Sequence, residues 1–166
     1  MMITWNSTMM TFLPFPDFTR SAQCLDSKRL GKQRVECLQI LHANLAITEG
    51  WRNHPATLMW RGYLQALADY ALCICEEWGK RCYRDTVTAQ MEDYLAGCSD
   101  WSPECAPPWL GDERLHSSHR AALLAKAPAH YGKFGWKEVP KIEYWWPSKE
   151  QANDKCQRYS LSTAAR

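Results

Sequence analysis

The stretch Asp-Ser-Lys-Arg-Leu-Gly-Lys-Gln-Arg-Val-Glu, residues Asp26 to Glu36, organises the chain because it sets four basic side chains in a helical pattern. At the helical repeat, Arg29, Lys32 and Glu36 share one face. An acid placed among basic groups is held ionised, and the basic groups can also bind phosphates. The alternative is an ordinary solvated helix face with i,i+4 ion pairs. The basic residues are Lys28, Arg29, Lys32 and Arg34.

The length and composition are those of one globular domain. A chain of 166 residues can bury a proper core without disulfides or metal. Its composition is 46% hydrophobic and 23% charged, and nine Trp residues provide flat aromatic surface beyond what a core needs. The formal net charge of +2 is nearly neutral, so any contact with nucleic acid must come from a local patch.

Cysteine usage and hydropathy indicate the compartment. The eight cysteines include no Cys-x-x-Cys pair. Residues 1–10 lack the apolar run of a signal peptide, and no segment approaches the roughly 20 apolar residues that span a bilayer. We expect reduced, mostly buried thiols in a cytoplasmic, nucleoid-associated protein without a membrane contact.

Helical periodicity and its end signals predict an all-α fold: a single compact domain of about four helices with irregular, aromatic-rich N- and C-terminal segments. We divide the chain into a candidate upstream extension at 1–9, a helical domain at 10–150 and a polar tail at 151–166. The first expected helix starts between Phe18 and Leu25 and ends near Ala46. The second runs from Pro55 to Gly79 and the third from Thr86 to Ala96. The fourth runs from Ser118 to Ala127, with Ser117 as its cap. The second helix carries an apolar stripe expected to be core, namely Met59, Tyr63, Leu67, Tyr70, Ile74 and Trp78.

A zinc site is worth testing because Cys98, Cys105, His116 and His119 cluster in sequence. Structural zinc draws pairs of ligands at short spacing, which His116-x-x-His119 satisfies. The two cysteines stand too far apart to form such a pair. The pattern is incomplete, so we expect helix caps and core thiols, with no metal and no cofactor.

Three further groups combine basic and aromatic side chains. Arg52-Asn53-His54 precedes a helix start, where backbone N–H groups favour an anion, and Ser118-His119-Arg120 repeats the arrangement. The run from His130 to Gly135 offers rings beside a cation, as unstacked bases require. For His54 or His119 alone, a capping role is the alternative. Together with the basic helix these groups predict a phosphate-lined surface made of Lys28, Arg29, Lys32, Arg34, Arg52, His54, Arg61, His119, Arg120, Tyr131 and Lys133.

At these residues the sequence resembles the pyrimidine-dimer DNA glycosylase family, the UV endonuclease V type, from Met10 to about Trp146. It is closest to the branch whose first helix reads Asp-x-Lys-Arg-Leu-x-Lys-Gln-Arg-x-Glu. That branch also shows Gly-Trp-Arg-Asn-His-Pro, here residues 50–55, and Pro-Pro-Trp-Leu-Gly-Asp, here residues 107–112. The His-x-Ser-His-Arg run matches residues 116–120, and phage-type members end in a motif similar to residues 130–135.

The resemblance implies a monomeric, metal-free repair enzyme that acts on double-stranded DNA carrying damaged or modified pyrimidines such as UV pyrimidine dimers. In such enzymes an N-terminal α-amine attacks the sugar C1′ and forms a Schiff base. A helix carboxylate supports glycosyl cleavage, and β-elimination then cuts the strand at the abasic site. An α-amine has a pKa near 8, so a useful fraction is neutral at pH 7. The alternative is a non-catalytic DNA-binding module that grips duplex phosphates with the basic helix.

Two departures from the phage-type pattern affect the catalytic residues. Phage-type chains begin with Thr after Met removal, which Met10-Thr11 would supply, so Thr11 is the expected nucleophile; the sequence instead starts at Met1-Met2. The phage-type helix reads Arg-Glu-x-x-Arg, and anchoring it on Arg34 places Gly31 at the position of the acid. Glu36 or Asp26 must then substitute. We prefer Glu36 because Arg29 and Lys32 lie on its face, whereas Asp26 could equally be a helix cap.

Overall fold

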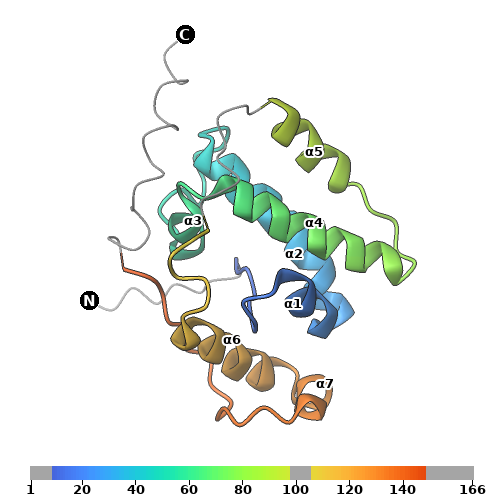
Figure 1. The fold of residues 1–166 in the computed structure, drawn as a ribbon, viewed down its shortest axis with the longest axis vertical. Coiled ribbons are helices and arrows are strands. Elements are labelled where there is room, and N and C mark those ends of the chain that lie inside the picture. The colour runs from blue at the N-terminus through green and yellow to red at the C-terminus, as the bar shows by residue number, and fades with distance from the viewer. Residues whose placement is uncertain (1–8, 98–105, 149–166) are drawn as a thin grey trace.

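The computed structural model describes residues 9–97 and 106–148, and in this part of the chain all regular secondary structure is helical (Figure 1). The all-α prediction is confirmed, but the count of about four helices is not, because the described residues form seven α-helices and one 3-10 helix. These are α1 (Phe18–Cys24), α2 (Ser27–Asn44), α3 (Pro55–Trp60), α4 (Leu64–Lys80), α5 (Thr88–Gly97), α6 (Glu113–Lys126), α7 (Pro128–Tyr131) and η1 (Gly132–Phe134).

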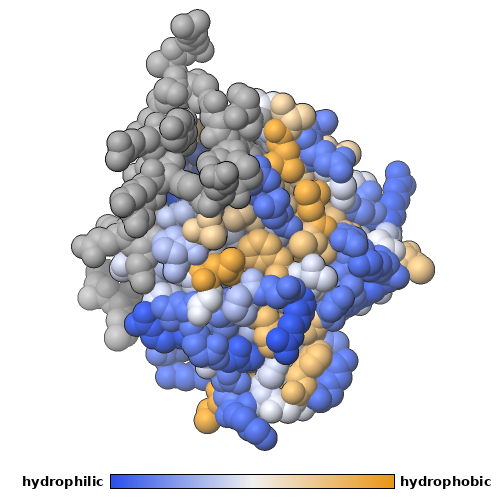
Figure 2. Space-filling model, in the orientation of Figure 1, coloured by the Kyte–Doolittle hydropathy of each residue, from blue (hydrophilic) through white to orange (hydrophobic). Residues whose placement is uncertain are grey.

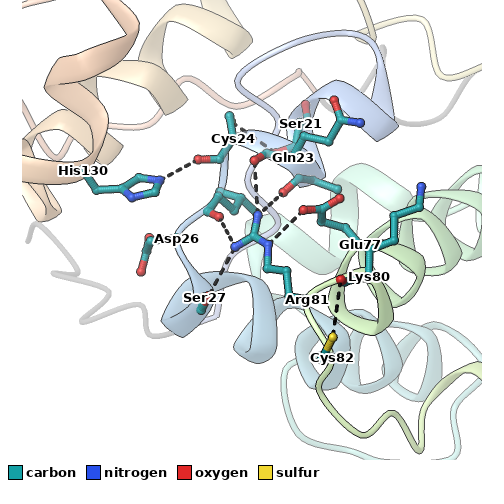
Figure 3. A network of polar contacts seen from close by, with 12 residues as sticks. Ser21, Gln23, Cys24, Asp26, Ser27, Glu77, Lys80, Arg81, Cys82 and His130 are labelled. Carbon is teal, nitrogen blue, oxygen red and sulfur yellow. Dashed lines mark hydrogen bonds and ion pairs between the residues drawn. The ribbon is translucent and has the colours of Figure 1, made fainter.

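The expected first helix is two helices, because the chain breaks between Cys24 and Ser27. Asp26 caps α2: its carboxylate accepts a hydrogen bond from the Arg29 N–H at 3.4 Å. The end of α1 leaves carbonyls without helical partners, and Arg81 at the end of α4 donates to them (Figure 3). Its Nη1 lies 2.8 Å from Leu25 O and its Nη2 lies 3.2 Å from Gln23 O.

The expected second helix is also interrupted, at Gly62, whose φ of 84° lies in the left-handed region that favours glycine. The core stripe predicted for it is confirmed in α3 and α4. Met59, Tyr63, Leu67, Tyr70 and Ile74 are buried, and Trp78 is half-buried and packs against the core.

The last long helix begins earlier than expected. The prediction of a start at Ser118 with Ser117 as cap is wrong, because α6 begins at Glu113 and its cap is Asp112. The Asp112 carboxylate accepts from the Arg114 N–H at 3.0 Å, and Glu113 adds the negative charge that a helix N-terminus favours.

Helix α4 packs against both α1 and α2, and α5 covers its outer side. The segment that starts at Met9 enters the middle of the molecule before it leads into α1 (Figure 1). The largest buried side chains include Trp60 and Trp109, whose rings meet edge to face at 4.8 Å. On the face drawn in Figure 2, hydrophilic residues cover most of the described surface and hydrophobic ones show between them. None of the described helices has the length and apolar character needed to cross a membrane.

Two of the helical glycines, Gly31 in α2 and Gly79 in α4, give a matched pair of stability predictions. A Cβ at Gly31 would lie 2.8 Å from the Trp78 ring, which is held by stacking on Tyr83 at 4.0 Å. A Cβ at Gly79 would meet nothing within 4 Å. We therefore expect Gly79→Ala to raise the free energy of unfolding by up to about 1 kcal/mol through helix propensity. Gly31→Ala should lower the free energy of unfolding by about 1 kcal/mol, because the clash of the new Cβ with the Trp78 ring outweighs the gain in helix propensity. Urea denaturation of both variants tests this, and equal stabilisation by the two would contradict it.

Candidate active site around Glu36

The N-terminal segment Met9 to Leu13 is buried, and the side chain of Gln33 on α2 holds it. Gln33 Nε2 donates to Met10 O at 2.6 Å, and Gln33 Oε1 accepts from Phe12 N at 2.8 Å. The Tyr70 hydroxyl donates to Phe12 O at 2.6 Å. The Gln33 carboxamide therefore makes both a donor and an acceptor hydrogen bond to the backbone of this segment, as a neighbouring β-strand would.

These contacts fix which backbone groups face α2. In an extended chain the N–H and C=O groups of alternate residues point to the same side. Met10 and Phe12 point theirs at Gln33, so the backbone groups of Thr11 face the other way. The Thr11 side chain is fully buried, and its Oγ1 accepts from Trp60 Nε1 at 3.0 Å.

Glu36 lies beside this segment and is only 4% exposed. Its Oε2 accepts from Gln33 Nε2 at 2.7 Å, its Oε1 lies 3.4 Å from Lys32 Nζ, and it also has a hydrogen bond with the Met10 backbone. Burial raises the pKa of Glu36 to about 7, against the lowering effects of Lys32, Met10 and Gln33. The expectation that its basic neighbours hold it ionised is therefore corrected: at neutral pH the carboxyl can both give and take a proton.

Basic and aromatic side chains surround Glu36. Lys126, in the last turn of α6, has its pKa lowered by partial burial and by the charges of Arg29 and Lys32, while Glu36 opposes this shift. Burial raises the pKa of Tyr144 to about 12, and Arg29 and Glu36 act on it as well. Sequence reasoning missed Lys126 and Tyr144, because no periodic pattern relates α6 or the C-terminal segment to α2.

Asp26 is in a different environment. Tyr131 donates a hydrogen bond from its hydroxyl to Asp26, and Arg29 Nη1 lies 3.1 Å from the carboxylate. Although burial acts to raise it, these hydrogen bonds hold the pKa of Asp26 below its ordinary value. The geometry thus matches the helix-cap alternative and favours Glu36 over Asp26 as the group that exchanges protons.

Several of the residues expected to bind DNA face solvent. Lys28, Lys32, Arg52 and Lys133 are exposed, and Arg29 is half-buried. Lys28, Arg29 and Lys32 lie on α2, and Lys32 contacts Glu36. The structure therefore brings the basic face of α2 to the acid, as the spacing predicted.

Three of the expected DNA-binding arginines are instead engaged within the protein. Arg34 pairs with Asp85 at 2.5 Å, and Arg120 pairs with Glu138 at 2.7 Å. The Arg34 and Arg120 side chains are 12% and 11% exposed, so little of either reaches solvent. Arg61 Nη2 donates to Arg52 O at 2.8 Å. These contacts give the three guanidinium groups structural roles.

The expected histidine and tyrosine contacts are also internal. His54 is buried and caps α3, with its Nδ1 accepting from Ala56 N at 3.1 Å. His119 is fully buried, its Nδ1 accepts from Leu13 N at 2.9 Å, and burial lowers its pKa to about 3. Tyr131 is fully buried as well. The rings of these three residues are buried, so none of them is exposed for stacking on a DNA base.

The two histidines of the candidate zinc pattern hold the N-terminal segment together. His116 Nδ1 lies 2.8 Å from Leu13 O, and its Nε2 accepts from Gly111 N at 3.0 Å. His119 bonds the N–H of the same Leu13. Within residues 9–97 and 106–148 no group of His, Cys, Asp and Glu could hold a metal ion. Cys98 and Cys105 lie outside the described residues.

Among the comparisons with known proteins, the scan against family models gives a match. A family model described as pyrimidine dimer DNA glycosylase matches residues 9–91, half of the chain. The match includes the buried N-terminal segment, α2 with Gln33 and Glu36, and α4. No curated protein and no solved structure matches the chain. The chain belongs to the pyrimidine dimer DNA glycosylase family.

Proposed function

We propose that this protein is a DNA glycosylase that cleaves the glycosyl bond of damaged pyrimidines, pyrimidine dimers first among them, and then cuts the abasic strand through an amine–sugar Schiff base. The observation that carries the proposal is the environment of Glu36. A buried carboxyl with a pKa of about 7 is tied through Gln33 to the peptide group of Met10. Family membership makes DNA the substrate class.

The chemistry needs one amine and one group that gives and takes protons. The neutral amine attacks C1′, the C1′–N bond to the base breaks, and the base nitrogen keeps the electron pair and takes a proton from protonated Glu36. The attached amine then gives a proton to O4′ as the C1′–O4′ bond breaks, which opens the sugar ring and leaves an iminium at C1′. Ionised Glu36 or a water molecule then removes a C2′ proton, and β-elimination expels the 3′ phosphate oxygen. A carboxyl with a pKa near the working pH suits both steps.

The contacts support Met10 over Thr11 as the residue that carries the amine. The Met10 backbone has the hydrogen bond with Glu36, whereas the groups of Thr11 face away. A chain that begins at Met10 would have its α-amine next to the acid. In a longer chain the same nitrogen belongs to a peptide bond and is not nucleophilic. Lys126 and Lys32 each carry a side-chain amine near Glu36, and either could act in place of the α-amine.

Duplex binding would rest on the exposed basic side chains. Lys28, Arg29 and Lys32 on α2 support contacts with phosphates around the reacting nucleotide, and Arg52 and Lys133 extend the charge beyond α2. Phosphate contacts of this kind fix register on the strand, and the chemistry at Glu36 then selects the damaged site.

The test is glycosyl-bond and strand cleavage on a duplex that carries a single cyclobutane pyrimidine dimer, with an undamaged duplex and duplexes with single modified pyrimidines alongside. We expect cleavage of the dimer duplex by the wild type and none by Glu36→Gln. Binding of every duplex without cleavage, unchanged by Glu36→Gln, would contradict the proposal and favour a non-catalytic DNA-binding module.

A further inference from the structure

Trp51, in the loop between α2 and α3, combines exposure with an unfavourable backbone conformation. Its side chain is 44% exposed and its φ is 66°. A bulky residue at positive φ is a true outlier, since Cβ then crowds the backbone. Such strain persists only where the surrounding structure imposes it, and it gathers at functional sites.

The loop around Trp51 is braced from several sides. Arg61 bonds Arg52 O at 2.8 Å and Asn44 Oδ1 at 3.3 Å. Asn44 in turn donates to Thr57 O in α3 at 3.1 Å. The N–H of His54 donates to Trp51 O at 3.0 Å and closes the turn. The backbone at Trp51 is therefore held in place before any ligand arrives, and ordering this loop costs little on binding.

A row of rings leads from Trp51 to the acid. Trp51 meets His54 at 5.5 Å between centroids, His54 meets Trp146 at 6.3 Å, and Trp146 meets Tyr144 at 5.8 Å. Tyr144 packs edge-on to Phe12, with 6.2 Å between ring centroids, and the charge of Glu36 acts on the pKa of Tyr144. The row of rings thus runs from the surface of the protein to the candidate active site. Of its four rings at Trp51, His54, Trp146 and Tyr144, Trp51 is the exposed one.

We propose that Trp51 is a positioning residue that stacks on an unpaired DNA base next to the reacting nucleotide. This inference rests on the proposed function. Base-to-aromatic stacking tolerates any sequence, because every base has a π-face, and loss of one such stack weakens binding roughly tenfold or more. The exposed side chain of neighbouring Arg52 is placed to meet the adjoining phosphate.

The experiment compares Trp51→Gly, Trp51→Phe and a matched control, Ile47→Ala, which trims a 53% exposed apolar side chain of the same loop. Glycine relieves the positive φ, so Trp51→Gly should keep or raise the Tm. The probe is a duplex with a tetrahydrofuran abasic analogue and a fluorescent 2-aminopurine beside it. We expect Trp51→Gly to weaken binding about tenfold and to lose quenching of the 2-aminopurine, while Trp51→Phe and Ile47→Ala remain close to the wild type.

The outcomes separate this inference from the proposed function. If the wild type prefers the abasic duplex over an undamaged one, but Trp51→Gly binds and quenches as well as the wild type, the stacking role is overturned and the proposed function stands. If the wild type shows no preference for the abasic duplex, both are overturned. A fall in Tm together with weaker binding for Trp51→Gly, with Trp51→Phe equally weak, would mean that the ring only supports the loop.

Discussion

Glu36→Gln should abolish glycosyl-bond cleavage and at the same time raise thermal stability at pH 8. The activity is lost because glutamine cannot exchange a proton, and removing a group of this kind typically costs about 10²- to 10⁴-fold in rate. The stability gain arises because ionised Glu36 is buried at 4% exposure, whereas a neutral amide of the same shape can still accept from Gln33.

The direction of the pH dependence follows from the raised pKa. The folded-state pKa of Glu36, about 7, lies above its ordinary value of 4.5, so between these values the folded state binds more protons than the unfolded one. The free energy of unfolding of the wild type should therefore fall as pH rises from about 4.5 to about 7. The variant escapes this loss, which amounts to up to about 3 kcal/mol.

Melting temperatures of the wild type and Glu36→Gln should coincide near pH 4.5 and separate by several degrees at pH 8. Glu76→Gln, at a 63% exposed glutamate of α4, is the matched control and should show no such divergence. A Glu36→Gln variant that melts below the wild type at pH 8, or that still releases bases, would contradict the assignment.

Gln33→Leu should be among the most damaging single changes to stability. Leucine fills a similar volume but leaves the Met10 carbonyl and the Phe12 N–H buried without their partner. Each buried polar group left unpaired costs about 1–3 kcal/mol, so we expect a loss of about 3–5 kcal/mol in the free energy of unfolding. Activity should fall as well, since the N-terminal segment is no longer held beside Glu36.

The matched control for Gln33 is Gln39→Leu, at an exposed position of the same helix. Surface changes of this kind usually stay within about 0.5 kcal/mol. Urea denaturation of the two variants gives the comparison. If Gln33→Leu and Gln39→Leu denature at the same urea concentration as the wild type, the N-terminal segment is held by something other than the Gln33 carboxamide.

Local signals predicted much of the fold. The apolar stripe from Met59 to Ile74 follows from helical periodicity and is core. The break between α1 and α2 was missed although Asp26 was recognised as a candidate cap, because the carbonyls of Leu25 and Gln23 find their partner in Arg81 at the end of α4. No local pattern at Leu25 announces a partner that lies so far along the chain.

The candidate site was readable only in part. The spacing of Lys32 and Glu36 predicted their contact, which lies at 3.4 Å. The sequence did not predict that the pKa of Glu36 is raised, because this shift depends on the burial that the segment around Met10 brings about. Arg34 was assigned to phosphate binding on charge alone, and its ion pair with Asp85 is visible only in the structure. A charge pattern does not say which side chains find a partner inside the protein.

Borohydride trapping tests directly whether Glu36 and a neighbouring α-amine form the catalytic centre. Three forms of the protein, beginning at Met1, at Met10 and at Thr11 with their N-termini verified by mass, are incubated with a dimer or abasic duplex and reduced. We expect a covalent protein–DNA adduct that maps to the Met10 amine, a weaker one for the form that begins at Thr11, and none for the form that begins at Met1. An adduct on Lys32 or Lys126 in every form, or base release without any adduct, would contradict it.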